Sequence, residues 1–198
     1  ADMDFQSPPA VLDALRGAVD HGVFGYMFPP AGLTNTIVQR MKDLYDWEIQ
    51  PEDVLFTPGV MVGVNMAARA FAHDGSILIQ PPVYHPFHYT PQWSNCGKQE
   101  APLRYVETDN GEFTYTVDLN TFEDAITPET KMFLLCSPHN PIGRVWTRDE
   151  LQGIADICEK HDLIICSDEI HSDLLLGGKK HIPTATLSPE IANRTITM

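Results

Sequence analysis

Two polar side chains stand just past two short apolar runs, and together they suggest a binding site. Asn140 comes after the apolar run 132–135, and Asp168 comes after the run 163–166. A short, continuously apolar run between turn signals is typical of a strand buried on both faces of a parallel sheet. Ligands of such sheets bind outside the carboxyl ends of the strands. The two strand ends therefore predict a site and supply two of its polar groups.

Other residues near the same predicted edge indicate what the site could bind. A carboxylate at the end of a buried strand, such as Asp168, needs a cation or a hydrogen-bond donor as its partner. The Asn140 amide can both donate and accept hydrogen bonds. Tyr84 follows the apolar run 76–79 and adds an aromatic ring. Gly59 precedes a predicted helix, whose free backbone N–H groups suit a phosphate. Pyridoxal phosphate (PLP) fits this set, since its enzymes pair the pyridinium nitrogen with a protein group.

Each residue also has a structural interpretation when it is taken alone. Asp168 could cap a helix or form an ion pair, and Asn140, which precedes a proline, could begin a turn. Tyr84 could be a core or rim aromatic residue, and most helix-opening glycines such as Gly59 bind nothing. The four residues in this order along the chain favour a ligand site.

A metal site is a weaker alternative. Asp168, His171 and Asp173 are close in sequence, with His161 nearby, but their spacing matches no zinc pattern, so no metal is predicted. Four other histidines are expected to be surface or loop residues: His85, His88, His139 and His181. A role in a substrate pocket stays open for either His85 or His88.

Strands and helices alternate along the chain from about residue 53, which predicts an α/β fold. Apolar runs predict strands at 54–56, 76–79, 132–135 and 163–166. Thr147 and Glu150 form a capping box for a helix whose apolar residues recur at i, i+3, i+4 and i+7 from Leu151. That helix joins the last two strands, and such a βαβ unit makes them parallel. The expected architecture is a three-layer αβα domain with a mostly parallel sheet.

Two further helices are expected before this region. Ser7 can cap a helix over residues 8–20, and Thr34 can cap the next one. The apolar face of the first helix is expected to pack on a domain outside this chain. We divide the chain into an N-terminal arm and small-domain segment, 1–33, and the first part of a large domain, 34–198.

Composition disfavours several classes of protein. The net charge of −14 opposes binding to a nucleic-acid backbone, because nothing offsets the repulsion by the phosphates. No apolar run reaches the ~18 residues that a membrane-spanning helix needs, and the first residues lack a signal-peptide pattern. Of the four cysteines, Cys136 and Cys166 lie in apolar runs and Cys158 lies on an apolar helix face, and buried free thiols favour a reducing compartment. We therefore expect a cytoplasmic protein with no nucleic-acid or membrane partner.

Five segments together resemble a known family: SPHNPIGRVW, SDEIH, LIQPPVYHPF, FTPGV and the opening ADMDF. They are similar to the PLP-dependent fold-type I enzymes of the class I and II aminotransferase superfamily. His171 stands where most aminotransferases of that superfamily carry tyrosine. Together with PPVYHPF and ADMDF, it points to the cystathionine β-lyase, or C–S lyase, branch (MalY/PatB-like).

The resemblance implies a role at the PLP ring for four matching positions. Asp168 would pair with the pyridine nitrogen and keep it protonated. Asn140 would hydrogen-bond the ring 3-oxygen, and His171 would lie on that side too. Tyr84 would stack on the ring.

The resemblance also implies how the phosphate is held and how subunits associate. The backbone of Val60 and Met61 would hold the phosphate. Tyr26 matches a family tyrosine that reaches across a homodimer to the phosphate of the neighbouring subunit. The substrate would be a sulfur-containing amino acid.

Two groups that the family needs are not matched in this sequence. The Schiff-base lysine of the family lies in a Ser-Lys setting, which no lysine here has, and Lys179 and Lys180 follow two glycines in a predicted turn. The chain opens without an initiator methionine and closes on 194–198, which resembles the beginning of a strand. We expect an internal piece of a longer enzyme, inactive alone, with the lysine beyond Met198 and the substrate-carboxylate arginine in a missing small domain.

The leading hypothesis is that the parent protein is a PLP-dependent C–S β-lyase. It would act on cystathionine or cysteine-like thioether amino acids and release a thiol, pyruvate and ammonia. A class I/II aminotransferase on the same fold is the enzymatic alternative. A PLP-fold protein that has lost catalysis and serves binding or interaction is the alternative from another class.

Overall fold

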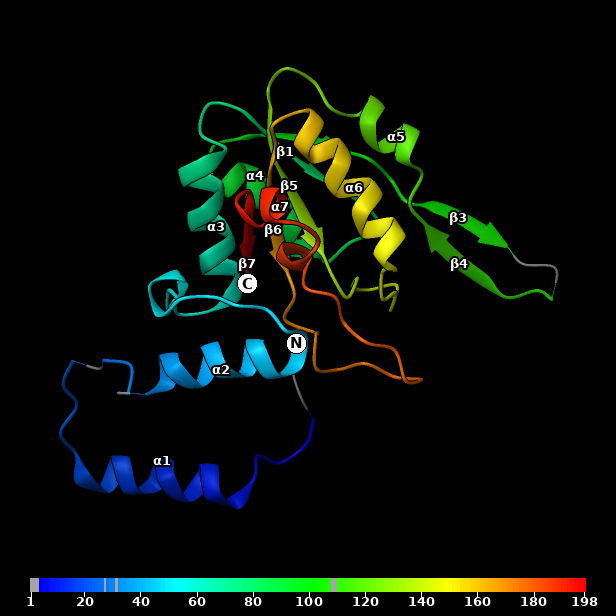
Figure 1. Cartoon of the computed structure of the whole chain (residues 1–198). Helices are drawn as coiled ribbons and strands as arrows, with labels where there is room; N and C mark the ends of the chain where they lie inside the picture. The colour runs from blue at the N-terminus through cyan, green and yellow to red at the C-terminus, as the bar shows by residue number, and fades with distance from the viewer. Residues whose placement is uncertain (1–3, 27, 31, 108–109) are drawn as a thin grey trace.

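A five-stranded parallel sheet forms the centre of the molecule (Figure 1). The computed structural model describes residues 4–26, 28–30, 32–107 and 110–198, so residues 1–3 of the ADMDF segment lie outside the described residues. Along the sheet the order is β2-β1-β5-β6-β7, and each neighbouring pair is parallel. The strands are β1 (Ser76–Ile79), β2 (Gly97–Glu100), β5 (Thr130–Cys136), β6 (Ile164–Asp168) and β7 (Thr195–Thr197).

Helices cover both faces of this sheet. One face is covered by α3 (Val60–Phe71) and α4 (Thr90–Trp93), and the other by α5 (Leu119–Asp124), α6 (Arg148–Lys160) and α7 (Pro189–Ala192). Short 3-10 turns lie at η1 (Pro51–Asp53), η2 (His85–His88) and η3 (Thr184–Thr186). An antiparallel hairpin, β3 (Arg104–Glu107) with β4 (Phe113–Thr116), projects beside α5 (Figure 1). The predicted three-layer αβα architecture is confirmed.

The period-two alternation of β5 divides the core into two apolar clusters. Met132 and Leu134 belong to the cluster on the α3 face, whereas Phe133 and Leu135 belong to the cluster on the α6 face. Successive side chains of a strand point to opposite faces, so the part of a central strand that is covered on both sides is apolar at successive positions. This is why the run 132–135 is continuous rather than alternating.

The predicted capping box at the start of α6 is present. Thr147 Oγ1 accepts from the Glu150 backbone N–H at 3.2 Å, and Glu150 Oε2 accepts from the Thr147 backbone N–H at 2.9 Å. The apolar stripe that begins at Leu151 is buried against the sheet. The capping box therefore fixes where the loop after β5 ends and α6 begins.

Three predictions near the N-terminus are wrong. Residues 54–56 do not form a strand; Leu55 is 86% exposed, and no described strand lies beside this segment to pair with it. The side chain of Ser7 does not cap α1 (Pro9–His21), which begins after Pro8. Thr34 lies inside α2 (Leu33–Tyr45), which begins after Gly32.

The two N-terminal helices differ in how they meet the rest of the molecule. No residue of α1 is buried, and its apolar residues Val11, Leu15 and Val19 are exposed. α2 contacts the segment after β6 through the Arg40–Asp173 ion pair at 2.7 Å and an edge-to-face contact between Tyr45 and His181. Within the described ranges no helix combines the length and apolar character needed to cross a bilayer.

Candidate functional site

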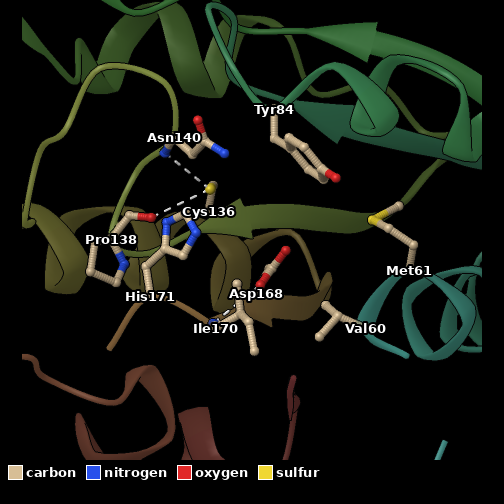
Figure 2. Close-up of a pocket in the computed structure, with 9 residues that line it drawn as sticks. All are labelled: Val60, Met61, Tyr84, Cys136, Pro138, Asn140, Asp168, Ile170 and His171. Atoms are coloured by element: carbon tan, nitrogen blue, oxygen red, sulfur yellow. Dashed lines mark hydrogen bonds between the residues drawn. The ribbon is translucent and has the colours of Figure 1, made fainter. Parts of the chain in front are cut away.

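The ends of β5 and β6 lie side by side and form the floor of a cavity of about 310 Å³. Cys136 and Asp168, the last residues of these strands, are direct partners in the parallel register. The cavity therefore sits at the carboxyl edge of the sheet, where the sequence predicts a site (Figure 2). It is lined by Val60, Met61, Tyr84, Cys136, Pro138, Asn140, Asp168, Ile170 and His171.

Asp168 is a buried carboxylate at the centre of this site. Its residue is 4% exposed, and burial raises the pKa of its carboxyl group. One oxygen accepts the Ile170 backbone N–H at 3.2 Å, and no other hydrogen bond to this carboxylate is present within the described part of the chain. The side chain points into the cavity (Figure 2). A ligand that brings a cationic N–H would supply the missing partner.

The loop that carries Asn140 is fastened to the end of β5. The Asn140 backbone N–H donates to Cys136 Sγ at 3.3 Å, and this thiol donates to the Pro138 carbonyl at 3.4 Å. Burial raises the pKa of the Cys136 thiol to about 12, so it stays protonated and keeps this contact. The Asn140 amide is left on the cavity side, facing Tyr84 (Figure 2).

His139 lies in the loop that carries Asn140, which agrees with its prediction as a surface or loop residue, but it is buried in that loop rather than exposed. Its Nε2–H donates to the Pro82 carbonyl at 3.0 Å, and its ring packs edge-on against Trp146. Burial lowers the pKa of His139 to about 4, which keeps the ring neutral at physiological pH. Through this hydrogen bond the loop of Asn140 is tied to the loop of Tyr84, so the two cavity walls are positioned together.

Tyr84 forms the wall opposite Asn140. Its ring makes edge contacts with His85 and Phe87, at centroid distances of 5.2 and 6.1 Å. Neither His85 nor His88 lines the cavity, and His88 lies against Glu100 instead. The aromatic face available to a ligand is therefore that of Tyr84.

The start of α3 offers backbone donors to the same cavity. Gly59 precedes the helix with φ 133° and ψ 153°, and no side chain caps it. The Gly63 N–H donates to the Gly59 carbonyl at 3.1 Å, so the N–H groups of Val60 and Met61 lie ahead of the first helical hydrogen bond. Such unpaired N–H groups at the positive end of a helix suit an anion.

We predict that Gly59→Ala weakens PLP binding to the full-length protein by about tenfold or more. A side chain at this φ and ψ costs on the order of 1–3 kcal/mol, and relief of that strain rotates the backbone N–H groups that open α3. The measurement is a PLP titration followed by absorbance. Gly17→Ala, in the interior of α1 with open space around it, is the matched control. Equal dissociation constants for the two variants would contradict the prediction.

The cavity brings together six of the seven residues predicted for the cofactor: Val60, Met61, Tyr84, Asn140, Asp168 and His171. Tyr26 is not among the lining residues, and it is 99% exposed. Lys179 and Lys180 lie in an exposed loop and do not line the cavity either. Among the described residues, no group of three or more acidic, histidine or cysteine side chains could hold a metal ion.

Three lining residues were not predicted: Cys136, Pro138 and Ile170. Cys136 shares the parity of Met132 and Leu134 along β5, so it points to the α3 face on which the cavity opens. The sequence shows that Cys136 shares a strand face with Met132 and Leu134. That face is known to border the site only from the position of α3 in the structure. His181, expected to be a surface or loop residue, lies in a loop but is buried there and is paired with Glu169.

Comparison with known proteins adds to this geometry. The family model described as "Aminotransferase class I and II" matches residues 2–198. Cystathionine beta-lyase PatB of Bacillus subtilis (strain 168) is 38% identical over 199 residues, which cover 100% of this chain and 50% of PatB. Cystalysin from Treponema denticola, whose structure contains pyridoxal 5′-phosphate, matches with a TM-score of 0.87 and 38% identity, over 100% of this chain and 49% of cystalysin.

A second solved structure agrees with the first. The PLP-bound C–S lyase from Staphylococcus hominis matches with a TM-score of 0.87 and 30% identity, over 100% of this chain and 50% of that lyase. The chain thus spans about half the length of the proteins that it matches.

Proposed function

The chain belongs to the class I and II aminotransferase family, and from this membership we propose that the full-length protein is a PLP-dependent C–S β-lyase. Its substrates would be cystathionine or cysteine-like thioether amino acids, cleaved to a thiol, pyruvate and ammonia. The observation that carries the proposal is one cavity that joins Asp168, Asn140, Tyr84 and the start of α3. The similarity to PatB, named a cystathionine beta-lyase, supports the lyase assignment.

The residues of the cavity fit PLP. Asp168 has an oxygen with no partner among the described residues, which suits the N–H of a protonated pyridine ring. The Asn140 amide can donate to the ring 3-oxygen, with His171 on the same side, and Tyr84 presents an aromatic face. The N–H groups of Val60 and Met61 can donate hydrogen bonds to a phosphate at the start of α3.

Each residue would contribute a distinct physical effect to the elimination. When bound, PLP supplies an electron sink for the charge left at the substrate Cα after deprotonation. Asp168 would hold the ring proton and thereby keep the sink electron-poor. Tyr84 and Asn140 would fix the plane and the in-plane orientation of the ring, so that the bond to be broken is aligned with it.

We assign the Cα proton transfer to a lysine outside this chain, because no lysine is among the described residues that line the cavity. We further propose that residues 1–33 belong to an arm and small domain, and residues 34–198 to the large domain. In a homodimer, Tyr26 of one subunit would reach the phosphate of its neighbour. Its exposed side chain supports such a contact.

The test is an assay of the full-length protein on cystathionine with added PLP. We expect pyruvate and a free thiol to appear without any 2-oxo acid, because β-elimination needs no amino-group acceptor. The alternative, an aminotransferase, is favoured by the family model itself. Amino-group transfer that depends on added 2-oxo acid, without pyruvate release, would reject the lyase assignment. If the protein binds PLP but shows neither β-elimination nor amino-group transfer, the result would favour a binding protein.

A further inference from the structure

Glu169 is a second buried carboxylate, directly beside Asp168 in sequence but on the opposite face of the sheet. It is 5% exposed and does not line the cavity. Asp168, the last residue of β6, lines the cavity on the α3 side, whereas Glu169, the residue after the strand, bonds the segment 181–184. Burial of a carboxylate is costly unless its oxygens accept hydrogen bonds, so the groups that bond Glu169 are important to the local structure.

Both oxygens of Glu169 are satisfied by groups on one segment and on β6. Oε2 accepts from His181 Nε2 at 2.6 Å, and His181 is itself 6% exposed. Oε1 accepts from Ser167 Oγ at 2.8 Å and from the Thr184 backbone N–H at 2.9 Å. The Ser167 and Thr184 hydroxyls also meet at 3.1 Å. These contacts close a buried polar network between the end of β6 and the chain 12–17 residues further on.

Between these two points the chain makes the turn that carries His171. The Ser172 N–H donates to the Glu169 carbonyl at 2.8 Å, and the Leu174 N–H donates to the His171 carbonyl at 2.9 Å. Beyond this turn the loop is open to solvent, and both Leu174 and Leu176 are exposed. The loop is therefore fastened at its two ends, and Glu169 forms part of both attachments.

The charge arrangement favours the same conclusion. Two adjacent buried carboxylates repel each other, and the charge of Glu169 contributes to raising the pKa of Asp168. An imidazole N–H on Glu169 partly offsets that field, as does the Ser167 hydroxyl. Removal of the imidazole would leave one oxygen of the buried Glu169 carboxylate without its hydrogen-bond donor.

We infer that the buried Glu169–His181 pair is a positioning pair, which holds Asp168 and His171 in the orientation that the cofactor requires. The inference rests on the proposed PLP function. Neither residue of the pair touches the cavity, so each acts through its neighbours. Misplacing a binding group by a fraction of its hydrogen-bond length is enough to lower affinity and turnover.

The experiment compares His181→Leu with His181→Gln in the full-length protein. Glutamine can place an amide N–H near the position of imidazole Nε2, whereas leucine fills space and donates nothing. We expect His181→Leu to raise the PLP dissociation constant and lower kcat, each by about ten- to a hundredfold. His181→Gln should restore most of both and return the visible absorbance band of bound PLP to its wild-type position.

Glu169→Gln keeps the size of the side chain but replaces one acceptor oxygen by an NH2 group, which cannot accept the hydrogen bonds that both carboxylate oxygens accept. It serves as the second variant if His181→Leu does not fold. We expect it to shift the PLP absorbance band and lower PLP affinity by about tenfold. Glu159→Gln, on the exposed end of α6, is the control. If Glu169→Gln, or a folded His181→Leu, matches wild type in PLP affinity, spectrum and kcat, the inference is wrong. If wild type itself binds no PLP, the proposed function fails as well, so the two failures are distinguishable.

Discussion

Asp168→Asn is expected to lower kcat for the proposed β-elimination by the full-length protein by on the order of 10²–10³-fold. The carboxylate lies in a site nearly closed to solvent, where an ionic contact is far stronger than in water. Asparagine keeps the shape of the side chain but cannot hold a ring proton by charge. The PLP ring would therefore stabilise less of the negative charge that develops at the substrate Cα. The measurement is steady-state pyruvate release with PLP at saturation.

Asp156→Asn provides the matched control, because Asp156 is exposed on α6, and the one hydrogen bond of its side chain among the described residues is from Gln152. We expect its kcat to equal that of wild type. A kcat for Asp168→Asn within about threefold of the control would show that Asp168 does not support the chemistry.

The same substitution should have the opposite effect on the stability of the protein without PLP. Burial raises the pKa of Asp168, so the folded protein binds this proton more tightly than the unfolded chain does. The resulting cost to stability is absent below the ordinary carboxyl pKa of 3.8 and is complete above the raised value. At pH 7, Asp168→Asn should therefore be more stable than wild type, and the difference should vanish in acid. Urea unfolding of the PLP-free proteins at both pH values measures this.

Phe133→Ala is expected to have the largest effect on stability, a loss of about 3–5 kcal/mol. Phe133 is fully buried at the middle of β5, and its ring meets that of Phe122 edge-on at a centroid distance of 4.8 Å. Alanine removes this ring contact and leaves a cavity between the sheet and the helices on the α6 face. The free energy of unfolding in urea, compared with wild type, is the measurement.

Phe113→Ala removes an aromatic ring of the same size from an exposed position on β4, where it stacks on Tyr105. We expect this control to cost about 1 kcal/mol or less. A cost for Phe133→Ala no larger than that of the control would mean that the β5 core is not packed as described.

Local sequence patterns were sufficient to predict the central βαβ unit. The continuous apolar runs identified β5 and β6, because strands covered on both faces bury every side chain. The Thr147–Glu150 spacing identified the start of α6, because a capping box is satisfied within four residues. With these elements in place, the sequence also determined that Asn140 and Asp168 lie at one sheet edge.

Contacts between distant segments were decided only by the tertiary structure. The run 54–56 is apolar but has no neighbouring strand, and hydrogen bonding to a neighbour is what makes a strand. His139 and His181 carry no periodic signal, and they are buried because Pro82 and Glu169 meet them from elsewhere in the chain. Sequence cannot place such partners, since burial of a polar ring depends on what the fold brings to it.

The sequence by itself thus determined the central βαβ unit and the edge at which the site lies. Only the tertiary structure decided that Asp168 faces the cavity while Glu169 faces His181. The physical reason is that the parity of a strand fixes which side chains share a face, whereas the elements packed on each face decide which of them is open to a ligand.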